Sequence, residues 1–390
     1  MKFGFYYSPD ADLTNRFNSN LNEEGKDENK WEIEDIPKYK LEDLEDQDKF
    51  WWNKRLYQQM ELCDISEDPW KIKMIRGHVG QEEIFIGSSA LMAVTLISRK
   101  ATLMGGIIDT GIDDDGSVAN FVETEQCIEI DNYFISFVMV RGSVPWFWDR
   151  VNNKQNDLTQ FFEIELLREF AMHEAAFKIH IKDLIEKYHK VVLINLLDTN
   201  NSYEHSLIKF YEFLLKNNKS TFKECLKYQY INYKKESVQE DIEKNTGLKI
   251  WGEAMKFLWI SKEGKVKSTQ KWVLRFNSLN CLHRTNNCQE KVSTIILKKI
   301  INKLHDEYII DETKIRWRTL IPKIEGLYRA NAAKICIESG CHCIINKQNE
   351  DDGYLQVMYG QITSLEKYFT NFISSIQEKE DNLYQEALGN

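Results

Sequence analysis

The chain has 390 residues, of which 42% are hydrophobic and 12% aromatic, enough apolar material for a large core, which excludes a mostly disordered protein. Its formal net charge of -10 argues against general adhesion to nucleic acid or anionic lipid, so any phosphate group must be held by a local basic site. The eight cysteines are unevenly spaced and follow no secretory signal, which predicts reduced thiols and no disulfide framework.

The first third of the chain changes from a polar to a globular composition. Residues 18–49 concentrate acid, asparagine and lysine, which predicts a solvated insertion. The stretch 50–62 (FWWNKRLYQQMEL) spaces large apolar residues as an amphipathic helix does. Two continuous apolar runs, Ala90 to Ser98 and Tyr133 to Val140, then predict central strands.

The remaining elements alternate between helices and strands. A helix of mixed polarity is predicted from about Leu158 to Lys187, followed by a buried strand from Val191 to Leu197. Apolar residues recur on one face from Thr285 to about Leu304, so a long helix is expected to start just after Arg284. This alternation predicts an α/β core.

One loop-to-helix junction, residues 275–286 (RFNSLNCLHRTN), has the composition of an anion site. A loop that enters a helix N-terminus directs backbone N–H groups and the positive end of the helix dipole at one point. Arg284, at the end of this loop, has the planar group that grips phosphate oxygens bidentately. In cysteine-dependent phosphatases a thiolate six residues before such an arginine attacks phosphorus, and here that residue is Ser278.

The segment FNSLNCLHRTNNCQ resembles the signature of the Sac family of phosphoinositide phosphatases, in which a cysteine, five residues and Arg-Thr-Asn form the phosphate loop. Further blocks follow the family's order: SPDADLTNRF, FWWNKRL, GIDDDGSVANFVETEQ, VRGSVPWFW and DNLYQEALGN. The resemblance therefore covers nearly the whole chain. It implies an α/β Sac phosphatase fold, with a mixed central sheet flanked by helices and a Cys-x5-Arg-type phosphate loop.

The resemblance also implies a division of the chain. Residues 1–90 correspond to the remainder of a truncated N-terminal Sac lobe, which carries the acidic insertion at about 18–49. Residues 91–390 correspond to the catalytic-type domain.

The family pattern assigns roles within the loop. Ser278 stands in the nucleophile position, Arg284 in the phosphate-binding position, and Asn280 and His283 where the family has aspartates. Phosphate contacts are expected from Arg284, Leu279, Cys281, Leu282 and Thr285. Accessory roles are expected for Asn286, Arg141, Glu123 and Glu125.

The departures from the family pattern weaken catalysis. A serine hydroxyl without an adjacent base is a poor nucleophile near neutral pH, and Asn280 and His283 remove the expected proton donor to the leaving oxygen. The stretch 102–110, where the family is rich in arginine, has no basic residue, which lowers the positive field for a multiply phosphorylated head group.

Several of these residues have a structural alternative. Ser278 and Thr285 are also ordinary helix N-caps, and Arg141 could only brace the turn at Gly142. Glu123 and Glu125 alternate on a strand, which is common for a structural hydrogen-bonding face. His283 could be a loop histidine whose hydrogen bonds are satisfied locally.

A group of thiols and one imidazole near the C-terminal end raises the question of zinc. The group consists of Cys336, Cys341, His342 and Cys343. It lacks a second ligand pair at a suitable spacing, so we predict neither a metal nor another cofactor.

Two functions remain open. The first is a Sac family member that binds a phosphatidylinositol monophosphate head group or a protein partner but is catalytically impaired, a pseudophosphatase. The alternative is an active phosphatase in which an engineered Cys-to-Ser change at Ser278 traps substrate. Three loop changes together favour natural loss. No transmembrane segment and no nucleic-acid partner are predicted, and the protein is expected to be cytoplasmic, with peripheral contact to the cytosolic face of internal membranes.

Overall fold

A computed structural model describes residues 4–8, 12–17, 49–62, 72–86, 90–101, 110–152, 162–231, 249–339, 342–344 and 356–358. The chain divides into two compact units, Met1–Glu338 and Ser339–Asn390. In the second unit, β13 (His342–Ile344) pairs antiparallel with β14 (Gln356–Met358). All other described elements belong to the first unit.

The first unit has a mixed α/β fold built on a ten-stranded sheet, in which eight strands follow the order β1-β2-β3-β4-β5-β12-β8-β9 and β10 joins β5 to β11. The strands of this sheet are β1 (Phe5–Tyr7), β2 (Met74–Ile86), β3 (Ala90–Lys100), β4 (Val122–Ile130), β5 (Tyr133–Arg141), β8 (Lys190–Asn195), β9 (Leu226–Tyr230), β10 (Leu258–Ile260), β11 (Val266–Ser268) and β12 (Trp272–Asn277). A separate ribbon is formed by β6 (Trp148–Asn152) and β7 (Phe162–Leu166). The described helices are α2 (Lys54–Leu62), α3 (Phe170–Tyr188), α4 (Ser202–Asn217), α6 (Lys249–Ala254), α7 (His283–Asp306), α8 (Trp317–Glu338) and the short η3 (Glu312–Lys314).

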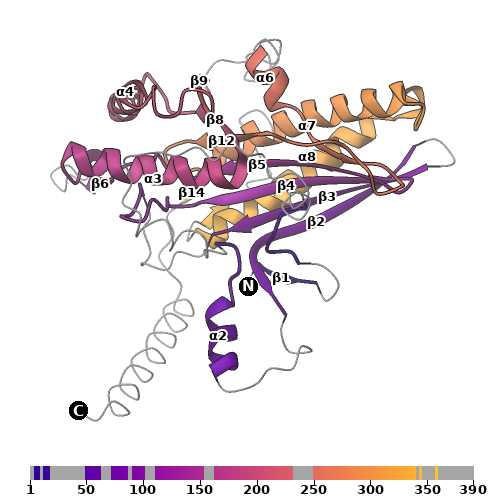
Figure 1. Cartoon of the computed structure of the whole chain (residues 1–390), viewed down its shortest axis with the longest axis horizontal. Helices are drawn as coiled ribbons and strands as arrows, with labels where there is room; N and C mark the ends of the chain where they lie inside the picture. Colours follow the sequence, from indigo (N-terminus) through magenta and orange to yellow (C-terminus); the bar gives the residue numbers. More distant parts are fainter. Residues whose placement is uncertain are drawn as a thin grey trace. The chain divides into compact units, whose positions relative to one another are not determined.

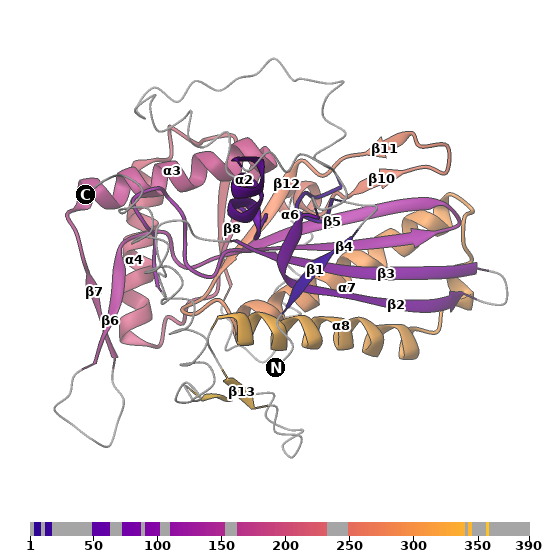
Figure 2. The same ribbon diagram turned by 90° about the horizontal axis from the view of Figure 1, so that it is seen from below.

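The sheet has an antiparallel half and a parallel half. Strands β1 to β5 pair antiparallel, whereas β5, β12, β8 and β9 pair parallel. Short links join β2 to β3 and β4 to β5, while parallel neighbours need crossovers such as α4, which connects β8 to β9. In Figures 1 and 2, α3 and α4 lie toward the end of the sheet opposite the β2–β3 hairpin, and α8 runs along β2.

Both faces of β8, in the parallel half, are covered, so Val191 to Ile194 form a continuous apolar run. Val191 and Leu193 of β8 pack in one core with residues of α3 and α4. Val192 and Ile194 pack in a second core with residues of α7 and α8. Strand β8, from which one of the site's segments leaves, is thus packed between two layers of helices.

Most predicted elements are confirmed. The runs at 90–98 and 133–140 form β3 and β5, and the run at 191–197 forms β8, which ends at Asn195. The long helix predicted from Thr285 to about Leu304 is α7, which begins two residues earlier, at His283, and therefore includes Arg284 in its first turn. The predicted helix over 50–62 begins later, at Lys54.

The helix predicted from about 158 to 187 is wrong at its start. Residues 153–161 lie outside the described ranges, residues 162–166 form β7, and α3 begins only at Phe170. The sequence of β7, FEIEL, alternates apolar and charged residues with the period of a strand, and it pairs with β6 from Trp148 to Asn152. Tertiary pairing therefore outweighs helix propensity here.

Some predictions fall on residues that the structure does not describe. These are most of the acidic insertion, the stretch 102–109 without basic residues, Cys341 and the closing block DNLYQEALGN. Strands β2 and β3 pair along their length across residue 90, and the division at that residue stays a prediction. Within the described ranges, no helix is long and apolar enough to cross a membrane.

Candidate functional site

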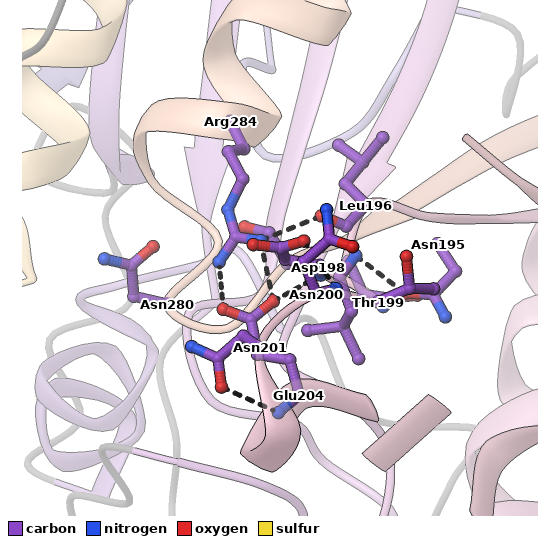
Figure 3. A network of polar contacts seen from close by, with 12 residues as sticks. Asn195, Leu196, Asp198, Thr199, Asn200, Asn201, Glu204, Asn280 and Arg284 are labelled. Atoms are coloured by element: carbon purple, nitrogen blue, oxygen red, sulfur yellow. Dashed lines mark hydrogen bonds and ion pairs between the residues drawn. The ribbon is translucent and has the colours of Figure 1, made fainter. Parts of the chain in front are cut away.

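The candidate site lies where two parallel strands end side by side. Asn195 at the end of β8 is in register with Asn277 at the end of β12, and the Asn277 side-chain amide donates to the Asn195 amide oxygen at 2.7 Å. The loop 278–284 leaves β12, and the segment 196–201 leaves β8 (Figure 3). The carboxyl ends of parallel strands are where α/β sheets commonly bind ligands.

Ser278 is fully buried and bonded within the loop. Its hydroxyl lies 3.0 Å from the Thr285 hydroxyl, and it accepts a hydrogen bond from the Cys281 backbone N–H at 3.1 Å. Neither neighbour is a base that could take the serine proton. Ser278 is not the N-cap that the structural alternative predicted, because Leu282 holds the N-cap position of α7 and no side chain caps the helix there.

The middle of the loop is closed by a second local contact. The Leu282 backbone N–H donates to the Asn280 side-chain oxygen at 3.3 Å, and Cys281 adopts a left-handed conformation with φ of 56°. Asn120 donates from its side chain to the Asn280 carbonyl at 3.4 Å. Two loop N–H groups are therefore occupied by side chains of the loop itself.

Arg284 reaches from α7 to the first turn of α4. Its Nη1 and Nη2 atoms each donate at 2.7 Å to the Glu204 carboxylate, and Nη1 also donates at 3.0 Å to the Leu196 carbonyl (Figure 3). Burial acts against the charge of Arg284, but the hydrogen bonds and charge of Glu204 outweigh it and raise the pKa of Arg284. The guanidinium is therefore a permanent, fixed cation beside the loop.

Two further arginines lie fully buried around the loop. Arg141, at the end of β5, donates to the Asn286 side chain and to the Cys281 carbonyl. Arg275, on β12, donates to the Ser143 carbonyl at 2.5 Å. Among the described residues neither arginine pairs with a carboxylate, and each keeps two nitrogens without a hydrogen-bond partner.

Burial lowers the pKa of Arg141 to about 10 and lowers the pKa of Arg275, but both stay protonated at neutral pH. Burial raises the pKa of the Cys281 thiol, against the charges of Arg275, Arg141 and Arg284, which lower it. Three guanidinium groups thus surround Cys281, in a medium that screens charge poorly.

The predicted carboxylates Glu123 and Glu125 form a different cluster. Arg99 lies 3.1 Å from Glu123 and 2.8 Å from Glu125, and all three side chains are buried. Tyr188 donates to Glu123, and Ser136 donates to Glu125. None of these described bonds involves the loop 278–284, which matches the structural alternative for both residues.

The remaining predicted residues lie in or beside the loop. Leu279 packs partly buried against the core of α3 and α4, and Leu282 is buried just before α7. Burial, followed by the neighbouring charge of Arg284, lowers the pKa of His283, so this imidazole is neutral at physiological pH.

Glu204, Leu196 and Arg275 are site residues that were not predicted. For Glu204 a signal exists, because it is an acidic residue in the first helical turn after a buried strand. For metals, the described ranges contain no group of three or more His, Cys, Asp or Glu side chains that could hold an ion. Of the group considered for zinc in the sequence, Cys336 is buried and forms no disulfide.

Comparison with known proteins gives a consistent result. A family model described as the SacI homology domain matches residues 1–238. The inositol-1,4,5-trisphosphate 5-phosphatase 1 of Schizosaccharomyces pombe is 32% identical over 245 residues, which are 58% of this chain and 21% of that protein. Human phosphatidylinositide phosphatase SAC2 is 28% identical over 337 residues, 77% of this chain and 27% of that protein. Human synaptojanin-1 is 29% identical over 263 residues, 66% of this chain and 16% of that protein.

The chain thus spans between 16% and 27% of the length of these three relatives.

Proposed function

Because the chain belongs to the SacI homology domain family, we propose that it is a phosphoinositide-binding member of this phosphatase family that has lost its catalytic nucleophile. In this proposal loop 278–284 is a Cys-x5-Arg-type phosphate loop that binds the head group of a phosphatidylinositol monophosphate. Residues 1–90 would then belong to the N-terminal lobe, and 91–390 to the catalytic-type domain.

The observation that carries the proposal is the state of Ser278. A serine attacks phosphorus only when a base removes its proton, and the Ser278 hydroxyl is bonded instead to a threonine hydroxyl and a backbone N–H. Removal of a covalent nucleophile in other enzymes costs on the order of 10⁴ to 10⁶ in rate. We therefore expect hydrolysis to be very slow or absent.

The charges around the loop support binding. Arg141, Arg275 and Arg284 contribute positive charge, and Asn280 and His283 stand, uncharged, where the family pattern has aspartates. Replacing carboxylates by neutral groups removes repulsion between the loop and a phosphate dianion, and it also removes a proton donor. Both changes favour retention of the ligand over its turnover.

We also propose that the protein acts at a membrane surface, as a peripheral protein on the cytosolic face of internal membranes, alone or with a protein partner. The ligand itself supports this, because a phosphoinositide head group is presented at the bilayer surface.

Vesicle binding tests the proposal. The full chain should sediment with phosphatidylcholine vesicles that contain a phosphatidylinositol monophosphate and much less with pure phosphatidylcholine vesicles. Arg284→Ala should remove this difference, and no phosphate should be released from the lipid. Equal sedimentation with both vesicles would reject the binding site.

The competing candidate is an active phosphatase with an engineered Cys-to-Ser change at Ser278. A cysteine codon at this position in the native gene would establish that candidate, and a serine codon would exclude it. Rapid phosphate release by the chain as it stands would reject both readings of Ser278.

A further inference from the structure

The clearest unassigned feature near the loop is the contact between Arg284 and Glu204. It joins the first turn of α7 to the first turn of α4, two segments separated by 80 positions in the chain (Figure 3). Glu204 is buried, with a side chain only 5% exposed, whereas 20% of the Arg284 side chain is exposed. The carboxylate is therefore the inner partner and the guanidinium the outer one.

Glu204 is itself held in place by backbone. Its Oε2 atom accepts the Asp198 backbone N–H at 2.6 Å, and its own N–H donates to the Asn201 side-chain oxygen at 3.4 Å. Its position in the first turn of a 16-residue helix also favours negative charge. The carboxylate is thus held by bonds that do not depend on Arg284.

The hydrogen bonds of Arg284 divide its guanidinium into two edges. A guanidinium has five N–H groups in a rigid plane. The two Nη1–H groups donate to Glu204 and Leu196, and one Nη2–H donates to Glu204. The remaining two, Nε–H and the second Nη2–H, have no hydrogen-bond partner among the described residues, and they point to the same side.

This free edge has the donor spacing that binds two oxygens of one phosphate group. Glu204 bonds the two Nη atoms at the end of the guanidinium, so the edge formed by Nε and Nη2 stays available. The same two bonds restrict rotation of the long arginine side chain.

We infer that Glu204 is a positioning residue: it fixes Arg284 so that the Nε and Nη2 edge is presented to a phosphate group bound at loop 278–284. The inference rests on the proposed function, since it requires that this loop binds phosphate. Glu204 does not contact the ligand, and its effect on binding passes through Arg284.

The test measures inorganic phosphate binding by the full chain, as the phosphate-dependent rise in melting temperature. Glu204→Gln should weaken phosphate binding about tenfold, because an amide cannot accept from both guanidinium nitrogens. Glu204→Asp should weaken it less. Glu212→Gln, on an exposed part of the same helix, is the matched control and should leave binding unchanged.

The double variant Glu204→Gln/Arg284→Ala should bind no more weakly than Arg284→Ala alone, since a positioning residue has no effect without its arginine. Tighter or unchanged binding in Glu204→Gln would overturn the inference, and tighter binding would show that the carboxylate competes with phosphate.

The Nε–H signal of Arg284 in a nitrogen-15 NMR spectrum separates this inference from the proposed function. Its signal, identified with Arg284→Lys, should be sharp in the parent chain and broadened or lost in Glu204→Gln. If the Arg284 signal is sharp in the parent chain but phosphate does not raise its melting temperature, the proposed function is rejected and the positioning role is retained. A signal that is equally averaged in both proteins would reject the positioning role. Circular dichroism would show that each variant is folded, and Glu204→Asp keeps the test decisive if Glu204→Gln is not.

Discussion

Two groups of buried arginines in this protein differ in what neutralises them. Arg99 lies between the carboxylates of Glu123 and Glu125. Arg141 and Arg275 are equally buried, but their described partners are carbonyl and amide oxygens and an imidazole nitrogen. Burying a charge without an oppositely charged partner costs free energy, so Arg141 and Arg275 lower the stability of the fold.

The difference separates a structural cluster from a ligand site. Around Arg99 each buried charge has an oppositely charged neighbour, since Lys187 and Arg16 also stabilise the charge of Glu123. The charges of Arg141 and Arg275 are not cancelled within the described chain, and they lie around Cys281 in the loop. Uncompensated buried charge is common at functional sites, because the ligand supplies the missing partner.

The largest effect on stability is expected from breaking the paired cluster. Arg99→Ala removes the salt bridges of the buried Glu123 and Glu125 and leaves only the charges of Lys187 and Arg16 near Glu123, so it should lower the free energy of unfolding by about 3–5 kcal/mol. Urea unfolding measures this change. The control is Lys73→Ala, which breaks an exposed ion pair with Asp12 and should cost less than about 1 kcal/mol. Similar losses in both variants would contradict the comparison.

The next effect concerns the nucleophile. In the positive field of the three arginines, Ser278→Cys should restore some hydrolysis of a phosphatidylinositol monophosphate, on the order of 10²-fold above the parent chain. We expect the gain to stay well below full activity, because burial opposes ionisation of a thiol here, as it does for Cys281. Adding Asn280→Asp and His283→Asp should raise the rate further, by about 10²-fold, if a carboxylate must protonate the leaving oxygen.

Arg284→Ala in the triple variant is the control for this rescue. Activity that survives it would arise elsewhere and would defeat the site assignment. Full activity of Ser278→Cys alone would favour the engineered alternative over natural loss. If the variant with all three loop changes folds but releases no phosphate, head-group binding itself has been lost.

The uncompensated arginines give a third test. Arg275→Met should weaken phosphate binding about tenfold while changing the free energy of unfolding by less than about 1–2 kcal/mol, because the lost cation has no carboxylate partner. Phosphate-dependent melting and urea unfolding measure the two quantities. A large loss of stability without a change in phosphate binding would place Arg275 in the structural group with Arg99.

The sequence predicts the strands of the central sheet well because their signals are local. Strands β3, β5 and β8 are continuous apolar runs bounded by polar residues, and both faces of β8 are buried. Strand β7 was missed although its sequence alternates apolar and charged residues, because five residues next to a helical segment do not identify a strand without its partner β6.

The candidate site could be predicted only in part for the same reason. Loop 278–284 is one contiguous segment, so a single motif identifies it. Glu204 and Arg275 join it only through the parallel register of β8 and β12, which brings the ends of these strands together. Glu123 and Glu125 lie in a block that accompanies the motif, yet their side chains bond to Arg99 on the next strand.

The smallest expected effect is a dependence of stability on pH through His180, on α3 next to Arg275. Its Nδ1 lies 2.9 Å from the Gly116 carbonyl and its Nε2 lies 3.4 Å from Arg275, so Nδ1 donates and Nε2 must accept, which requires the neutral ring. Burial first, and then the charges of Arg275 and Lys49, hold the pKa of His180 well below its ordinary value of 6.5.

Because unfolded His180 titrates near its ordinary pKa, below about pH 6.5 the unfolded chain binds a proton that the folded chain does not, and stability must fall as pH falls. Between pH 7.5 and 5.5 this residue should cost about 1 kcal/mol. Urea unfolding at both pH values should therefore show a steeper loss for the parent chain than for His180→Gln, which keeps a donor and an acceptor but does not titrate. An equal loss in the two proteins would mean that His180 has the same pKa in the folded and unfolded chain, so that it becomes protonated below about pH 6.5 and can no longer accept from Arg275.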